Sequence, residues 1–167
     1  MIKRNLYLII FLLSFFSFAQ NENCTSVFLI RHAEKVRHNL ENKNPHLNYA
    51  GILRADKWKD VLKHIKFDKI LSTNLYRTLE TANPISKTNN LKITTYIPSE
   101  EFYNNFIQEN NGKTILVVGH SNTTPFFVNS LIENNFYNEI EDNNNGNLYF
   151  VSQCGDSPPN HVLYYIN

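Results

Sequence analysis

The stretch VFLIRHAEK, residues 27–35, is the starting point for predicting how this chain folds. Four apolar residues lead directly into the guanidinium of Arg31 and the imidazole of His32. A short apolar run of this kind predicts a buried strand over residues 26–30. Taken alone, the polar pair could simply mark the place where the strand reaches the surface. The alternative is that the strand presents both side chains to one shared anion.

Beyond this strand and a polar loop over 36–48, apolar runs alternate with segments of helical spacing. Strands separated by helices predict an α/β fold, a three-layer α/β/α sandwich with a mainly parallel central sheet. The last two strands are expected to form an antiparallel edge. Pro84 should bend or end its helix, and Thr124 before Pro125 suits a helix start. The expected helices are 49–65, 75–87, 99–110 and 124–133, and the further strands are 68–71, 92–97, 114–118, 148–153 and 162–166.

The first 19 residues have the pattern of a secretory signal. Lys3 and Arg4 precede an almost wholly apolar run over residues 6–18, and Ser17 and Ala19 are the small residues that a signal peptidase reads. The alternative, a membrane anchor, is disfavoured because a span needs about 20 apolar residues. We therefore expect cleavage after Ala19, export to the periplasm or the medium, and a single domain over 20–167 without a membrane anchor.

The two cysteines, Cys24 and Cys154, suit a disulfide in an exported chain, because such a chain meets an oxidising compartment. Two unpaired thiols are the alternative. A metal site is poorly supported, since neither cysteine has a close Cys or His partner at zinc spacing. His38, His46, His64 and His161 show no such spacing either and are expected at the surface, and Arg54 is expected to be a solvated helix residue.

The charge of the chain is nearly balanced. Without residues 1–19, which contain Lys3 and Arg4, 14 basic and 15 acidic residues remain, a net charge of −1. Nothing in this balance attracts nucleic acid or a membrane surface. Any site for an anion must therefore be a local cluster of positive groups.

Three predicted strands end in polar residues that could form such a cluster. In an open parallel sheet, ligands bind beyond the carboxyl ends of the strands. The first strand ends in Arg31 and His32, and the segment STNLYRT, residues 72–78, places Arg77 in the first turn of a helix. The segment VVGHSN, residues 117–122, ends in His120, Ser121 and Asn122 just before another helix.

This set of side chains suits a phosphoryl group. Arginine binds phosphate oxygens with two parallel hydrogen bonds, and free N–H groups at a helix start favour the same anion. A neutral histidine with one bare nitrogen can attack phosphorus and carry the group covalently. Its other nitrogen should then donate to a backbone carbonyl, which fixes the tautomer.

The segments RHAE, STNLYRT and VVGHSN, in this order and each after a predicted strand, resemble the motifs of the histidine phosphatase superfamily. The branch is the one that includes phosphoglycerate mutases and short phosphohistidine phosphatases. The resemblance runs from about residue 27 to 122, and LNYAG, residues 47–51, resembles the entry into the family's first long helix. It implies that His32 is the phosphorylated nucleophile, that Arg31, Arg77 and His120 complete the phosphate pocket, and that no metal or organic cofactor is needed.

The chain departs from the family pattern at two points. Ala33 stands where the family commonly has glycine, and the chain has little room for the insertion that covers the site in larger members, so the pocket should be shallow and open. The proton donor is the weakest assignment. Glu34, Glu100 and Glu101 are the candidates, but Ser99 followed by two carboxylates is also what a helix start requires.

The sequence as a whole predicts an exported phosphatase that hydrolyses small phosphomonoesters through a phosphohistidine on His32. One alternative is a binding module that captures phosphorylated ligands in the same pocket without hydrolysis. A phosphomutase is a further alternative, disfavoured because a mutase must shield its phosphoenzyme from water. The physiological substrate and the oligomeric state do not follow from the sequence.

Overall fold

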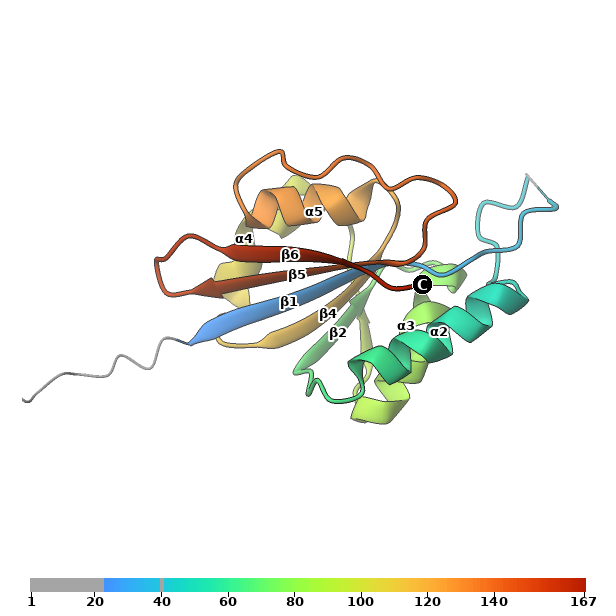
Figure 1. Cartoon of the computed structure of the whole chain (residues 1–167), viewed down its shortest axis with the longest axis horizontal. Helices are drawn as coiled ribbons and strands as arrows, with labels where there is room; N and C mark the ends of the chain where they lie inside the picture. Colours follow the sequence, from blue (N-terminus) through green and yellow to red (C-terminus); the bar gives the residue numbers. More distant parts are fainter. Residues whose placement is uncertain (1–22, 40) are drawn as a thin grey trace, which may run out of the picture.

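The structure is a computed structural model that describes residues 23–39 and 41–167. A six-stranded sheet in the order β3-β2-β4-β1-β5-β6 forms its centre (Figure 1). The strands are β1 (Cys24–Arg31), β2 (Lys69–Ser72), β3 (Ile93–Thr95), β4 (Thr114–Gly119), β5 (Asn147–Cys154) and β6 (Asn160–Tyr165). The helices are α2 (Tyr49–Leu62), α3 (Tyr76–Asn89), α4 (Glu100–Glu109) and α5 (Thr123–Leu131).

Helices cover both faces of the sheet, as the alternating pattern predicts. On one face, α2 and α3 bury Trp58, Leu62 and Ile85 against the apolar side chains of the central strands. On the other face, α4 and α5 bury Phe106 and Phe127. Because successive side chains of a strand point to opposite faces, the continuous apolar runs of β1 and β4 serve both cores. The predicted three-layer α/β/α sandwich is confirmed.

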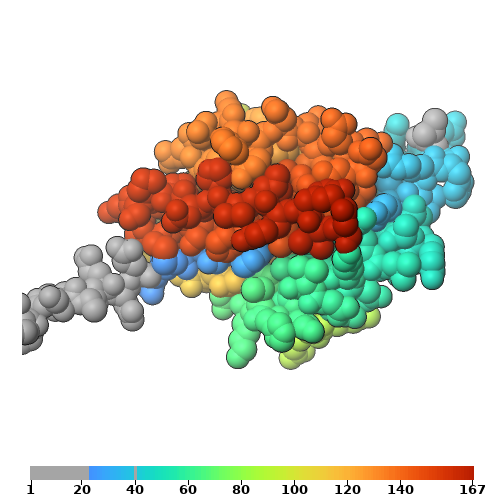
Figure 2. Space-filling model, viewed as in Figure 1, coloured from blue at the N-terminus to red at the C-terminus, as the bar shows by residue number. Residues whose placement is uncertain are grey.

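The sheet is mainly parallel with an antiparallel edge, also as predicted. Strand β1 pairs in parallel with β4, β4 with β2, and β2 with β3. Strand β5 then runs antiparallel to both β1 and β6. Figure 2 shows the red C-terminal segment, which contains β6, as a band across the middle of one face, between the orange and the green parts of the chain.

The parallel pairing places three strand ends at one edge. Arg31 at the end of β1 lies opposite Gly119 at the end of β4, and Ser72 at the end of β2 lies opposite Val118. The segments that follow β1, β2 and β4 therefore leave the sheet close together. We call this edge the carboxyl end of the sheet.

The opposite edge, the amino end of the sheet, carries the disulfide. Cys24 at the start of β1 is paired in register with Cys154 at the end of β5, and the two are joined across 130 residues. The predicted disulfide is thus present, and it joins the first strand, β1, to the antiparallel strand β5.

Some boundaries differ from the predictions for clear physical reasons. Helix α3 does not end at Pro84 but continues to Asn89, because Ile85 and Ser86 directly after the proline are buried and hold the next turn in place. Helix α2 ends at Leu62, three residues earlier than expected. Helix α5 begins at Thr123 after Asn122, so Thr124 is not its cap.

The start of α2 was predicted correctly and depends on a glycine. The Asn48 side chain accepts a hydrogen bond from the Gly51 N–H at 2.9 Å, which caps the helix. A Cβ at Gly51 would lie 2.1 Å from the backbone oxygen of Glu34. Only glycine therefore lets this helix approach the segment that follows β1.

The expected signal sequence over 1–19 lies outside the described residues. Within the part of the chain that the structure describes, no helix is long and apolar enough to cross a membrane.

Candidate functional site

The carboxyl end of the sheet brings together two histidines and two arginines from three segments of the chain. His32 follows β1, His120 follows β4, and their ring centroids lie 5.5 Å apart. The His32 N–H donates to the Gly119 carbonyl at 2.9 Å, which continues the β1–β4 pairing by one residue. Arg31 precedes His32, and Arg77 lies in the first turn of α3.

The ring of His32 is held in one tautomer. Its Nδ1 lies 2.7 Å from the backbone oxygen of Ala33. A carbonyl oxygen only accepts hydrogen bonds, so Nδ1 carries the proton and Nε2 of the neutral ring has a free lone pair. Burial, together with the nearby positive groups of Arg31 and Arg77, lowers the pKa of His32 to about 3. At neutral pH the ring is therefore uncharged and its Nε2 is available for nucleophilic attack.

The backbone around His32 is fixed by two partners far away in the sequence. The Ala33 N–H donates to the Thr81 hydroxyl of α3 at 2.9 Å, and the Asn145 side chain donates to the His32 carbonyl at 2.8 Å. Ala33 is completely buried, so its methyl group fits where the family commonly has glycine. These contacts hold the imidazole at the end of β1.

His120 is also held neutral and is oriented by a hydroxyl pair. Its Nε2 lies 2.8 Å from the hydroxyl of Thr73, which lies 3.0 Å from the hydroxyl of Thr78. Burial, followed by the charges of Arg77 and Arg31, lowers the pKa of His120 to about 4. Sequence analysis missed the two threonines, although Thr73 follows β2 directly, at the same edge of the sheet as His120.

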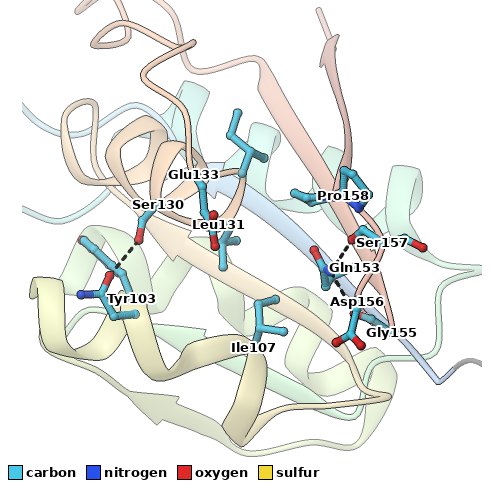
Figure 3. Close-up of a pocket in the computed structure, with 13 residues that line it drawn as sticks. Tyr103, Ile107, Ser130, Leu131, Glu133, Gln153, Gly155, Asp156, Ser157 and Pro158 are labelled. Atoms are coloured by element: carbon cyan, nitrogen blue, oxygen red, sulfur yellow. Dashed lines mark hydrogen bonds between the residues drawn. The ribbon is translucent and has the colours of Figure 1, made fainter.

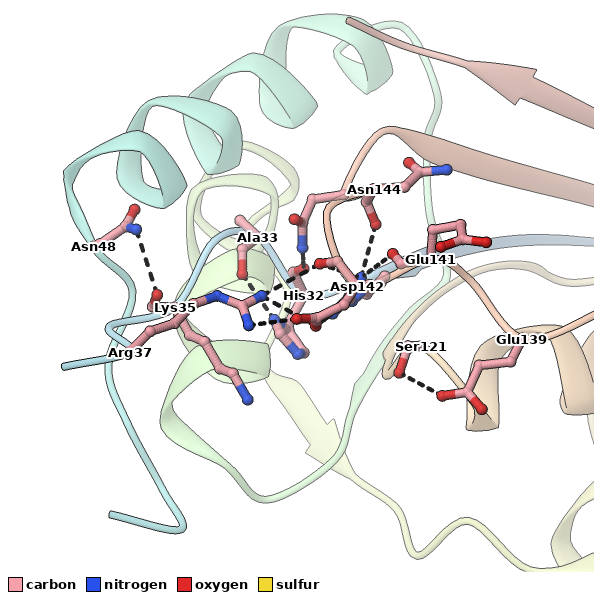
Figure 4. A network of polar contacts seen from close by, with 12 residues as sticks. His32, Ala33, Lys35, Arg37, Asn48, Ser121, Glu139, Glu141, Asp142 and Asn144 are labelled. Carbon is pink, nitrogen blue, oxygen red and sulfur yellow. Dashed lines mark hydrogen bonds and ion pairs between the residues drawn. The ribbon is translucent and has the colours of Figure 1, made fainter. Parts of the chain in front are cut away.

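Arg31 is almost completely buried and is anchored by the loop that precedes β5. Its Nη1 donates to the carbonyls of Glu141, Asp142 and Asn144 at 2.8, 3.1 and 2.9 Å. Its Nη2 donates to the carboxylate of Asp142 at 3.0 Å (Figure 4). No sequence rule links positions more than 100 residues apart, so these loop residues could not be predicted as partners of Arg31.

Both arginines keep an unpaired donor. The Nε atoms of Arg31 and Arg77 are buried and have no hydrogen-bond partner among the described residues. Arg77 makes only a long contact, 3.4 Å, from Nη1 to the carbonyl of Lys43. Burial and the charge of Arg31 lower the pKa of Arg77. Because buried N–H donors normally have partners, the two Nε–H groups indicate room for an anion.

The two other predicted phosphate ligands are placed less tightly. The hydroxyl of Ser121 donates to Glu139 at 3.1 Å, and Asn122 is exposed at the start of α5 without a side-chain cap bond. Both residues follow His120 at the same edge. Ser121 is therefore bonded to an acid, and Asn122 is free to turn.

The three candidate acids differ in their surroundings. Glu34 accepts a hydrogen bond from Arg54 at 2.8 Å through one oxygen, while its other oxygen is buried and unpaired within the described part of the chain. Arg54 is therefore paired and not simply solvated, contrary to expectation. Glu100 and Glu101 are exposed in the first turn of α4, where Ser99 caps the helix as predicted.

Over the described residues, no group of three or more His, Cys, Asp or Glu side chains has an arrangement that could hold a metal ion. A cavity of about 560 Å³ opens beside the arginine-bound Asp142 and is lined partly by Glu34, Arg37 and Asn48. A cavity of about 920 Å³ lies elsewhere, between α4, the end of α5 and the turn after β5, near the amino end of the sheet (Figure 3). The chemistry-bearing residues are therefore not in the larger cavity.

Comparison with known proteins agrees with the superfamily that the sequence motifs resemble. A family model described as histidine phosphatase superfamily (branch 1) matches residues 27–97. No curated protein matches the chain significantly in sequence. The predicted resemblance to this superfamily is confirmed by the family match, which includes His32 and Arg77.

Solved structures of phosphatases and of a phosphoglycerate mutase share the fold of this chain at low sequence identity. A protein assigned as the phosphohistidine phosphatase SixA from Agrobacterium tumefaciens superimposes with a TM-score of 0.65 at 18% identity, covering 86% of this chain and 99% of its own. A phosphoserine phosphatase from Entamoeba histolytica gives 0.64 at 18% identity, with 86% and 97% covered. A phosphoglycerate mutase from Bacillus anthracis gives 0.63 at 14% identity, with 87% and 94% covered. The family match supports a phosphatase or mutase activity, and these neighbours show the shared fold.

Proposed function

We propose that this chain is a phosphatase that hydrolyses small phosphomonoesters. The chain has the fold and the motifs of the histidine phosphatase superfamily. The reaction would pass through a phosphohistidine on His32. The observation that carries the proposal is the tautomer of His32, whose Nδ1 is bound to the Ala33 carbonyl and whose Nε2 is bare. The charges of Arg31 and Arg77 act on the same ring, and the Nε atoms of both arginines are buried without partners among the described residues.

In the first step, the Nε2 lone pair of His32 would attack phosphorus and the bond to the ester oxygen would break. The leaving oxygen takes a proton, either from water or from a carboxylic acid. In the second step, water attacks phosphorus, the P–N bond breaks, and its electron pair returns to Nε2. Orthophosphate leaves and the water gives up one proton.

Arg31, Arg77 and His120 would bind the phosphoryl oxygens in both steps. A positive charge placed in advance around the transferred group stabilises the transition state without reorganisation. Ser121 and Asn122 at the start of α5 would add donors to the same group. These roles need no metal ion or organic cofactor.

The proton donor remains a choice among Glu34, Glu100 and Glu101. Glu34 is the nearest to His32 in sequence, and one of its oxygens has no partner among the described residues. Its other oxygen accepts a hydrogen bond from the Nε of Arg54 at 2.8 Å. Substrates with a good leaving group would not need a protein acid, because the leaving oxygen is then stable without a proton.

We further propose that the chain is exported and that residues 20–167 form one domain. The disulfide between Cys24 and Cys154 supports an oxidising compartment. Export after removal of residues 1–19 would supply that compartment.

Turnover of 4-nitrophenyl phosphate tests the proposed activity. The full chain should release phosphate in the presence of a chelator, and His32→Ala should reduce the rate to background. His64→Ala is the matched control, because His64 is exposed beyond the end of α2, and it should leave the rate unchanged. A His32→Ala protein that keeps near-normal activity would overturn the mechanism.

A phosphomutase is the second candidate, because one structural neighbour is a phosphoglycerate mutase. The two activities differ in what accepts the phosphoryl group from His32. Release of inorganic phosphate in step with substrate loss supports the phosphatase. Formation of an isomeric phosphate ester without phosphate release supports the mutase.

A further inference from the structure

The surroundings of His32 differ on its two sides. Figure 4 shows Lys35 and Arg37 on one side of the histidine, and Ser121 with Glu139 on the other. Lys35 and Arg37 belong to the segment that leaves β1, and Glu139 belongs to the loop before β5. The site is therefore basic on the side of the β1 segment and acidic on the side of α5.

Arg37 lies against the same carboxylate as Arg31. Its Nη1 lies 2.6 Å from one Asp142 oxygen, and its Nη2 lies 3.1 Å from the other. Arg31 donates to that second oxygen at 3.0 Å. One carboxylate thus stands between two guanidiniums, and the Arg37 side chain is still about half exposed, at 47%.

Lys35 has no carboxylate of its own. Within the described part of the chain its ammonium group makes no hydrogen bond or ion pair, although its backbone is fixed by Asn48 and by a bridge to Leu47. Partial burial and the nearby charges of Arg77 and Arg37 lower the pKa of Lys35. The fixed backbone and the position of Lys35 beside Arg37 and His32 in Figure 4 place this charge at the site.

The positive charge here exceeds what one phosphoryl group requires. Among the described residues, Asp142 is the one carboxylate that forms an ion pair with any of Arg31, Arg77, Lys35 and Arg37, and Glu34 on this side is paired with Arg54. A phosphomonoester brings a charge of roughly −1.5 to −2. At least one positive charge on the Lys35 side would remain without a counter-charge after such a group had bound.

We infer that the substrate carries a second anionic group, a carboxylate or a further phosphate, which binds to Lys35 and Arg37 next to the phosphoryl group. This inference rests on the proposed function, since it describes the substrate of the same site. An anion at this position would be attracted by the half-buried Lys35 and the exposed Arg37 and kept away from the acidic side by Glu139. Neutral and cationic phosphomonoesters would lack that interaction.

A pair of substrates that differ in a single charge tests this inference. The rates of hydrolysis of 3-carboxyphenyl phosphate and 3-carbamoylphenyl phosphate are compared at low ionic strength. The full chain should prefer the carboxylate about tenfold in kcat/KM, and the preference should shrink as salt screens the charges. Lys35→Gln and Arg37→Gln should each reduce the preference to about threefold or less, mainly by slowing hydrolysis of the carboxylate substrate.

Lys66→Gln is the matched control for the change in net charge. Lys66 is exposed in the turn between α2 and β2, at the amino end of the sheet, so this variant should keep the full preference. Equal rates for both substrates in the full chain, or a preference that survives in both variants, would overturn the inference while the phosphatase proposal stands. No turnover of either substrate would instead refute the phosphatase proposal and the inference with it.

Discussion

Most of the buried polar atoms that lack a partner in the described residues lie at the carboxyl end of the sheet, whereas the buried Thr25 hydroxyl at the amino end is paired. Of the five buried side-chain atoms without a hydrogen bond in the described residues, four lie around the ends of β1 and β4 and the start of α3 and α5. At the amino end, the Thr25 hydroxyl donates to the Asn110 carbonyl at 3.3 Å and accepts from the Gly112 N–H at 3.0 Å. Unpaired buried donors cost stability, so they indicate a place reserved for a ligand.

The larger cavity lies near the amino end, and this contrast shows that volume alone does not locate the chemistry. Its polar lining residues bond to their neighbours, as Gln153 does to the carbonyls of Gly155 and Ser157 at 3.0 and 2.6 Å (Figure 3). His32, His120, Arg31 and Arg77 all lie at the carboxyl end of the sheet. Changes at the amino end should therefore affect stability, and changes at the carboxyl end should affect activity.

Removing the disulfide should have the largest effect of all on stability. Cys24→Ser with Cys154→Ser opens a loop of 130 residues, and loop entropy gives an upper estimate of about 5 kcal/mol for the loss. Urea unfolding of both proteins measures it. The folded double variant should keep its kcat/KM, and a loss of activity without a loss of stability would contradict the separation of the two ends.

Arg77→Ala should reduce kcat/KM for 4-nitrophenyl phosphate by about 10²- to 10³-fold, because it removes a positive charge from beside the transferred phosphoryl group. Arg77 is a better choice than Arg31, whose guanidinium also anchors the loop before β5. Lys66→Ala removes a positive charge at the amino end and should change the rate by less than twofold. Steady-state kinetics on the three proteins would expose a mistake if Arg77→Ala and Lys66→Ala behaved alike.

The two buried histidines should make stability fall in acid. Their pKa values are lowered from the ordinary 6.5 to about 3 for His32 and about 4 for His120. Between these values and 6.5 the unfolded chain binds protons that the folded chain does not, so the free energy of unfolding decreases as the pH falls through this window. The slope should be about 1.4 kcal/mol per pH unit for each group.

Urea unfolding at pH 7, 6 and 5 measures this slope. His120→Gln should remove about half of it, and His64→Gln, at an exposed position, should leave it unchanged. A slope that is the same in His120→Gln as in the unaltered chain would mean that His120 is not held neutral by the fold.

Thr73→Val should have the smallest of these effects, about fivefold in kcat/KM. We propose that Thr73 is a positioning residue, because its hydroxyl fixes the ring of His120 through Nε2. Valine keeps the shape and removes the hydrogen bond, which contributes about 1 kcal/mol. Thr73→Ser should restore the rate, and a serine variant as slow as the valine variant would argue for a purely structural role.

The fold was predictable from the sequence because its signals are local. Apolar runs such as residues 114–118 and the helix cap Ser99 depend on a few neighbouring positions. The predicted helix over 75–87 already passed Pro84, and burial of Ile85 and Ser86 explains why the proline does not end it. Thr124 is not the helix cap, because α5 begins one residue earlier. The Thr123 hydroxyl accepts a hydrogen bond from the His120 N–H at 3.2 Å.

The site residues at strand ends were predictable from the sequence, whereas those that a loop supplies were not. His32, Arg31, Arg77 and His120 were predicted to meet, and the structure places them at one edge. Asp142 and Asn145 come from a loop rich in asparagine whose composition indicates only turns. Their contacts with Arg31 and with the His32 carbonyl depend on how β5 returns beside β1, which no local pattern encodes.

Trapping the covalent intermediate tests the central claim most directly. The protein is mixed with a ³²P-labelled phosphomonoester, quenched within milliseconds in alkali, and the modified residue is located by mass spectrometry. We expect a label on His32 that is stable in alkali and lost in acid. The label should be missing from His32→Ala but present in His64→Ala. A label on another residue, or normal turnover with no labelled protein at any time point, would contradict it.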